Sequence, residues 1–487
     1  MSAFAAPAVR PGLAARQASG LLCRDAALSL TVALLLPLLL QAAGLAQVNR
    51  LLYPLTAVAA AAYLYNRGSP WYVGLCVWLF AASPLVRRMA DAQLGFELAS
   101  PIILAPYLAS AVAGLSFFPY VLRARPVLAW PFALILACVV YAFTLAVLDG
   151  RMASAVVDLL KWSVGPLMAL HLMTCGHQRE ALHQVVLRAF VAAGIAMSVY
   201  GIGQFLAPAP WDIEWLRNMI LQGMTSGGRP EPFEIRVFST MHSAGSFGAF
   251  LTVAFVFLLA TPALVALPGL ALVGAGLALC QYRAVWAATG LAALCVVLAA
   301  PGRVKVRVVL GAAAVAIGLG GVATVPEVED VLAKRVRSLT ELGADASGED
   351  RLSQYGRLLN EGSNLVLGSG LAITGAARQL DQQNATVIDS GLLEITLALG
   401  VCAGAVFLGC LGYLAWQVCT LPPRLCRHVY LYRGIVAAWL LQLPFGSVHV
   451  GELGFGPWIC VGLALSSLAA RPDAPRLAPA AEAGSRA

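Results

Sequence analysis

Three charged residues lie where apolar stretches of the sequence begin, and together they could act on a phosphorylated substrate. Arg236 lies in PFEIRVFSTMHSAGSFGAFL, Arg283 in CQYRAVWAATG and Asp389 in NATVIDSGLLEITLALGVCAG. A guanidinium group binds phosphate oxygens through paired hydrogen bonds, so two arginines suit a diphosphate. A carboxylate can accept a hydroxyl proton as a general base. Headgroup anchoring by the arginines and helix capping by the aspartate are the alternative interpretations.

Four further charged residues extend this candidate site. Arg87 and Arg88 follow an apolar run, and Arg351 lies in GEDRLSQY. We predict that these three arginines bind an anionic substrate, because arginine favours phosphate and carboxylate ligands. Glu394 lies in GLLEI, slightly further into the same apolar run as Asp389, and is the alternative candidate for the base.

Motifs that would bind a metal ion or a nucleotide are absent from the sequence. It contains no GxxxxGK[ST] phosphate loop, no HExxH and no paired CxxC. None of the eleven cysteines lies in the long polar segments 207–242 and 326–389, which indicates small buried side chains rather than disulfides. We therefore expect no metal site, no cofactor, no use of ATP and no nucleic-acid partner.

The elements that must position these residues are membrane-spanning helices. Of the 487 residues, 60% are hydrophobic and 11% are charged, and the mean hydropathy is +0.80. Soluble domains have roughly 45–50% apolar and about 25% charged residues. The apolar residues form continuous runs, which predict an all-α, multi-pass membrane protein. About fourteen runs are present, at residues 26–46, 51–65, 71–86, 97–117, 128–148, 153–173, 185–206, 243–260, 266–281, 284–300, 308–325, 391–417, 434–447 and 453–470.

Lysine and arginine are distributed unequally between the short loops that join these runs. With the N-terminus in the cytoplasm, 17 of them lie on the cytoplasmic side and five lie outside. The five are Arg50, Arg87, Arg88, Arg151 and Arg283. This bias is typical of membrane proteins and predicts that both chain ends are cytoplasmic.

This orientation divides the chain into three groups of transmembrane helices, two large exported loops and a tail. They comprise residues 1–206, 243–325 and 390–470, residues 207–242 and 326–389, and residues 471–487, respectively. Helical apolar spacing in 327–342 and 351–360 predicts amphipathic helices that lie on the membrane or over a cavity. The tail is rich in alanine and proline, so we expect it to be disordered in the cytoplasm.

A few polar residues lie within or beside the apolar runs. Asp158 and Lys161 are three residues apart, which is consistent with either a substrate path or an ion pair within one helix. Gln204 and His449 are typical of polar groups that pack helices together or lie at the membrane interface.

The order of motifs between about residues 195 and 415 resembles the O-antigen ligase and Wzy-type polymerase superfamily. The chain has R-x-F-S-T followed by G-S-F-G, then Q-Y-R-x-x-W, L-G-S-G-L, an acidic position, G-L-L-E and L-G-x-x-A-G. Within this region, YGIGQFLAPAPWDIEW followed by RVFSTMHSAGSF is most similar to exopolysaccharide-type polymerases.

This resemblance implies a glycosyltransferase of the bacterial inner membrane with its active site on the periplasmic face. The donor would be an oligosaccharide on undecaprenyl diphosphate, surrounded by membrane lipid, and a flippase and a chain-length regulator would be partner proteins. Arg236 and Arg283 match the two arginines of the family, which would stabilise the diphosphate leaving group. Ligases carry a histidine where this sequence has Asp389, and this difference favours polymerisation.

Two other functions remain as alternatives. A ligase would transfer a finished glycan from the same lipid to another acceptor. A lipid-linked oligosaccharide flippase, or another transporter, would carry its critical charges at mid-membrane in broken helices, with short loops on both sides. The candidate charges of this chain instead gather at the outer interface beside a long loop, which favours an enzyme.

Overall fold

The computed structural model of this protein consists of α-helices joined by short connections. It describes residues 24–97, 100–117, 126–222, 226–302, 304–311, 313, 365–373, 381 and 390–469. Within these residues no β-strand forms, and one isolated β-bridge joins Gly228 and Ile235. The all-α fold predicted from the composition is therefore confirmed.

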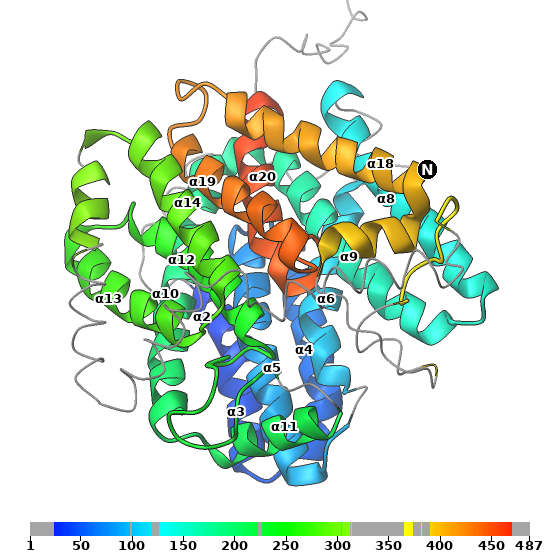
Figure 1. Ribbon diagram of the computed structural model, residues 1–487, viewed down its shortest axis with the longest axis vertical. Helices are drawn as coiled ribbons and strands as arrows, with labels where there is room; N and C mark the ends of the chain where they lie inside the picture. Colours follow the sequence, from blue (N-terminus) through cyan, green and yellow to red (C-terminus); the bar gives the residue numbers. More distant parts are fainter. Residues whose placement is uncertain are drawn as a thin grey trace, which may run out of the picture.

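The helices pack side by side in a bundle (Figure 1), and most of them lie in the predicted apolar runs. Along the chain they are α2 (Arg24–Leu30), η1 (Thr31–Leu35), α3 (Leu36–Ala42), α4 (Ala46–Asn66), α5 (Trp71–Leu94), η2 (Pro101–Ile103), α6 (Leu104–Ala111), η3 (Val112–Ser116), α8 (Pro126–Leu148), α9 (Met152–Thr174), η4 (Gly176–Gln178), α10 (Arg179–Leu206), α11 (Pro210–Leu221), α12 (Ala244–Leu258), α13 (Ala263–Leu279), α14 (Arg283–Ala299), α18 (Gly391–Thr420), α19 (Val429–Gln442), η7 (Leu443–Phe445) and α20 (Gly451–Ala469). The helix α11 instead forms within the predicted exported loop 207–242. Most of the run 308–325 and the predicted amphipathic helices 327–342 and 351–360 lie outside the described residues.

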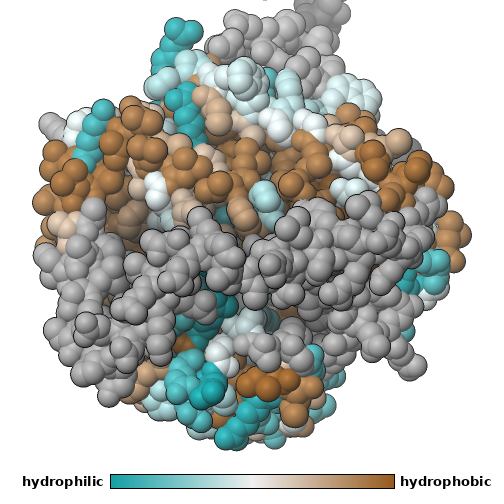
Figure 2. Space-filling view, viewed as in Figure 1, coloured by the Kyte–Doolittle hydropathy of each residue, from teal (hydrophilic) through white to brown (hydrophobic). Residues whose placement is uncertain are grey.

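The outer faces of the helices are suited to a lipid environment. Seven of the described helices are long and apolar enough to cross a membrane, and five shorter helices are also apolar. Large apolar side chains are exposed on them, such as Leu264 on α13, Leu298 on α14 and Trp416 on α18. Figure 2 shows apolar surface over α14 and α18 and hydrophilic surface beside α11. The chain is a multi-pass membrane protein, and the count of about fourteen spans stays a prediction.

Connections that the sequence predicts on the same side of the membrane contact one another. Arg179 and Leu425, both in predicted cytoplasmic loops, share a hydrogen bond of 3.1 Å. Tyr282 and Phe445, at the opposite end, share one of 3.0 Å. We call this second end the site end. It contains the C-termini of α5, α10, α13 and α19 and the N-termini of α12, α14, α18 and α20.

One predicted helix boundary is wrong. The third apolar run predicts a helix end near residue 86, but α5 continues to Leu94 and contains Arg87 and Arg88. Both arginines are buried. Arg87 pairs with Asp91 at 3.1 Å, and Arg88 pairs with Asp212 at 3.0 Å. Because a paired cation can be carried inside a bundle, the helix need not end where the charges begin.

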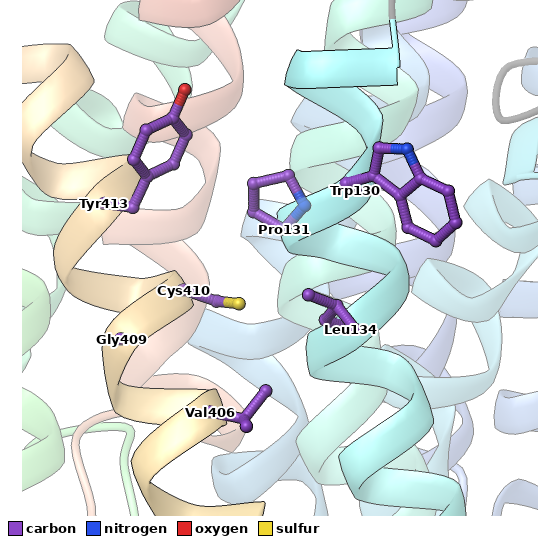
Figure 3. Close-up of a pocket in the computed structure, with 7 residues that line it drawn as sticks. All are labelled: Trp130, Pro131, Leu134, Val406, Gly409, Cys410 and Tyr413. Atoms are coloured by element: carbon purple, nitrogen blue, oxygen red, sulfur yellow. The ribbon is translucent and has the colours of Figure 1, made fainter.

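An apolar groove lies on the surface between α8 and α18 (Figure 3). Its volume is about 480 Å³, and its lining residues are Trp130, Pro131, Leu134, Val406, Gly409, Cys410 and Tyr413. None of these side chains is charged. The groove lies beside the N-terminal half of α8 and the C-terminal half of α18, away from the site end. It fits a hydrocarbon chain of a lipid better than a sugar, because sugars need polar partners.

Candidate functional site

Strained backbone marks three segments at the site end. In the part of the chain that the structure describes, the non-glycine residues with positive φ are Phe233 (64°), Ser239 (53°), Gln281 (51°) and Ala372 (58°). Such conformations are uncommon for these residue types and concentrate at functional sites, where the surroundings hold them in place. They lie in or beside RVFST, QYR and LGSGL, three of the motifs on which the family resemblance rests.

Buried polar side chains hold the segment 226–243. The side-chain oxygen of Gln204 accepts hydrogen bonds from the backbone N–H groups of Phe238 and Ser239, at 3.2 and 2.8 Å. The guanidinium group of Arg88 donates to the carbonyl groups of Ser239 and Met241. Gln204 is thus a packing group, as the sequence suggests, and the segment is fixed by α10 and α5.

Arg236 joins this segment to the turn that carries Arg283. Its Nη1 donates to the carbonyl of Ser226, and its Nη2 donates to the carbonyl of Gln281, both at 3.1 Å. Arg283, two positions after Gln281, is the first residue of α14. The segments of the two predicted catalytic arginines, distant in the sequence, therefore meet at one end of the bundle.

Two of the predicted site residues, the catalytic Asp389 and the substrate-binding Arg351, lie outside the described residues. Ser390, the next residue along the chain, caps the N-terminus of α18. Glu394, the alternative base, lies in the first turn of α18, and its carboxylate is 3.9 Å from the imidazole of His449. This places one of the two proposed bases at the site end.

The segment 365–373 inserts where α18 is broken. Gly400 has φ 74° and ψ 174°, which interrupts the helix. The N–H groups of Ser369 and Gly370 donate to the carbonyls of Leu397 and Ala398, at 2.8 and 3.0 Å. Irregular backbone inside a membrane needs such partners, because lipid offers none. The inserted segment therefore supplies hydrogen-bond partners for the carbonyl groups at the helix break.

Charged residues at the start of α9 hold the other side of this segment. Arg151 donates to the carbonyl of Ser369, and Asp158 accepts the N–H of Ala372 at 3.0 Å. Asp158 also forms an ion pair of 3.2 Å with Lys161. Of the two interpretations that the sequence left open for this pair, the structure shows the ion pair within one helix.

Arg87 and Arg88 are engaged with the protein itself. The side chain of Arg88 is 0% exposed and is paired with Asp212. The guanidinium group of Arg87 lies over the ring of Trp215, 4.9 Å from its centroid, and pairs with Asp91. Both arginines support the site end from within the bundle, and their contact with a substrate stays a prediction.

Glu452, an acidic residue in the first turn of α20, was not among the candidate residues selected from the sequence. Its carboxylate accepts hydrogen bonds from the hydroxyl groups of Tyr107 at 2.7 Å and Ser246 at 3.2 Å. These contacts join α6, α12 and α20 at the site end. Its position at the edge of an apolar run could have identified it, because charged residues in membrane segments are rare and usually functional.

His242 was also missed, although it lies in the motif that carries Arg236. Its ring stacks on Trp215 with centroids 5.0 Å apart and an interplanar angle of 26°. Burial lowers the pKa of His242 well below its ordinary value, and the nearby cations Arg87, Arg88 and Lys161 lower this pKa further. The imidazole is therefore neutral at physiological pH. A lone histidine in a loop gives no spacing pattern to recognise.

The site end combines groups for anion binding with candidate proton acceptors. Arg236 and Arg283 are the cations of the two motifs, and Glu394, Glu452 and His242 are the acceptors. Among the described residues, no group of three histidine, cysteine or acidic side chains could hold a metal ion. No family model matches this sequence, and no curated protein matches it significantly.

Proposed function

We propose that this chain is a membrane glycosyltransferase that polymerises saccharide units carried on undecaprenyl diphosphate. It would act on the exported face of the bacterial inner membrane. The hydrogen bond from Arg236 to the carbonyl of Gln281 supports this proposal most directly, because Arg236 thereby lies beside the segment of Arg283. A diphosphate ligand needs cationic forks that converge from different parts of a fold.

The proposed reaction is transfer of a glycan to a sugar hydroxyl. The hydroxyl oxygen forms a bond to the anomeric carbon of the donor, and the bond from that carbon to the phosphate oxygen breaks. Negative charge then develops on the diphosphate, where Arg236 and Arg283 would stabilise it. The contacts of Gln204 and Arg88 fix the segment of Arg236 in advance, and such preorganised charge is effective in catalysis.

Reconstitution tests this function directly. The purified protein in liposomes should lengthen lipid-linked repeat units without ATP and in the presence of a chelator, because the diphosphate linkage supplies the driving force. Gel electrophoresis and mass spectrometry of the lipid-linked products would measure chain length. Absence of elongation, or an absolute need for a nucleotide or divalent ion, would contradict the proposal.

One observation favours the transporter alternative. The helix break at Gly400 is a feature that transporters use to expose carbonyl groups to substrate. Here Ser369 and Gly370 satisfy the carbonyls of Leu397 and Ala398, which speaks against that use. In the same liposomes, movement of a fluorescent lipid-linked saccharide across the bilayer without new glycosidic bonds would support a transporter. Transfer to an added acceptor other than the growing chain would support a ligase.

A further inference from the structure

Three histidines, His242, His428 and His449, have no hydrogen bond to either ring nitrogen among the described residues, and only His242 also lacks a carboxylate within 4.0 Å. In the part of the chain that the structure describes, neither of its ring nitrogens has a hydrogen-bond partner, and both are shielded from solvent. The other five histidines each have a polar neighbour, and they are His171, His177, His183, His428 and His449. A shielded polar atom without a partner is costly, so a native protein that retains one has a reason to do so.

The surroundings of His242 restrict the kind of ligand that could pair with it. The cations Arg87 and Arg88 of α5 and Lys161 of α9 lie close enough to lower the pKa of His242, although each of them is also paired with a carboxylate, Asp91, Asp212 and Asp158, respectively. Together with burial, they disfavour a protonated imidazole. A neutral imidazole offers one nitrogen as a hydrogen-bond acceptor. The fitting ligand is therefore a neutral hydrogen-bond donor, and in a glycan that donor is a hydroxyl group.

We propose that His242 binds the acceptor hydroxyl of the growing glycan and takes its proton during transfer. This inference rests on the proposed glycosyltransferase function. As the hydroxyl oxygen bonds to the anomeric carbon, its proton moves to a ring nitrogen of His242. The electron pair of the broken carbon–oxygen bond leaves with the diphosphate, and the imidazolium later releases its proton to water.

The donor would also activate this base. Without a bound donor, the cations near His242 oppose its protonation. A diphosphate bound by Arg236 and Arg283 would add negative charge at the site end, which would remove part of that repulsion. His242 would then become an effective base only when the lipid-linked donor is in place, and this limits abstraction of a proton in the absence of a donor.

Chemical rescue by imidazole tests the proposal. His242→Ala should lower the turnover of the reconstituted protein by on the order of 10²–10⁴-fold, the usual contribution of a general base. Added imidazole should restore part of the activity, and the restored rate should rise with pH through the ordinary imidazole pKa of about 6.5. His177→Ala, an exposed histidine at the other end of the bundle, is the matched control and should behave like wild type.

The outcomes separate this inference from the proposed function. Normal elongation by His242→Ala, or a loss that imidazole does not restore, would overturn the role of His242 and leave the function intact. Rescue of Asp389→Ala by acetate, with no effect of imidazole on His242→Ala, would assign the base to Asp389. A wild-type protein that transfers no glycan would overturn both proposals.

Discussion

The guanidinium group of Arg88 shows how a buried cation can serve a site without touching a ligand. It is paired with Asp212 of α11 and bonded to two carbonyl groups of the segment 226–243. Both side chains of the ion pair are 0% exposed. Removal of one partner of such a pair leaves an uncompensated charge in the interior. We therefore expect substitution of Arg88 to lower the stability of the fold, and to affect activity only as a result.

Arg88→Met should lower the free energy of unfolding by about 3–5 kcal/mol, the usual cost of breaking a buried ion pair. The matched control is Arg229→Met, because Arg229 forms an ion pair with Glu234 in the same segment but is 76% exposed. Exposed pairs contribute about 0–1 kcal/mol. Thermal unfolding in detergent micelles would measure both variants, and equal melting temperatures would contradict this assignment.

Arg236 is expected to act through its geometry as well as its charge. Lysine keeps the charge but loses the planar fork that spans the carbonyls of Ser226 and Gln281 and could bind phosphate. Arg236→Lys should reduce glycan transfer by on the order of 10²–10³-fold at unchanged membrane abundance. Arg229→Lys controls for charge in the same segment. Near-normal polymer from Arg236→Lys would make Arg236 a structural or headgroup-binding residue.

His449 predicts a dependence of stability on pH. Burial lowers the pKa of its imidazole from 6.5 to about 3. Between these values the unfolded chain binds a proton that the folded protein does not, so stability is highest above pH 6.5 and falls as the pH decreases towards 3. His449→Gln should flatten the curve of melting temperature against pH in this window. His177→Gln should leave the curve unchanged, and a steeper curve for His449→Gln would refute the argument.

At the scale of elements, the contact between the segment 365–373 and the break in α18 depends on glycine. A Cβ atom on Gly368 would lie 2.4 Å from the backbone nitrogen of Gly400, and one on Gly370 would lie 2.5 Å from that of Ala146. Real Cβ atoms do not approach backbone so closely, and all three glycines have positive φ. The two glycines of LGSGL are therefore required by close backbone contacts, which cannot be recognised from the sequence alone.

Gly370→Ala should displace the segment 365–373 from α8 and lower both the melting temperature and glycan transfer. Such a change combines a backbone clash with an unfavourable φ, so an effect of more than about 2 kcal/mol on stability is expected. Gly412→Ala on α18 is the control, since its Cβ would meet nothing within 4 Å. If both variants melt alike, the inserted segment does not contribute to the fold as described.

At the scale of the whole molecule, the site end should face the exported side of the membrane. The expectation follows from the charge bias of the short loops. In a background without native cysteines, Ser226→Cys at the site end should react with an impermeant thiol reagent added outside. Arg424→Cys, at the opposite end, should react only after the inner face is opened. Both positions are exposed. The reverse pattern would invert the topology and exclude the proposed site.

Hydropathy predicted most of the described helices, because continuous apolar runs have few alternatives in a membrane, but it did not predict α11 in the loop 207–242. It failed at α5, where Arg87 and Arg88 obtain their partners partly from Asp212, a residue distant in the sequence. The motif residues Arg236 and Arg283 could be selected from sequence, but not the contact of Arg236 with Gln281. Glu452 and His242 were missed because their significance lies in neighbours that only the folded chain supplies.

The segment 365–373 is synthesised long after α9, although the two contact each other in the folded protein. Arg151 and its acceptor Leu371 are 220 residues apart. Ribosomes add about 5–20 residues per second, so roughly ten to forty seconds separate the emergence of the two. During that interval α8 and α9 lie in the bilayer, and among the described residues Asp149 is the ion-pair partner of Arg151. Chains that terminate before residue 365 should therefore remain targets for membrane quality control, however many helices they have already inserted.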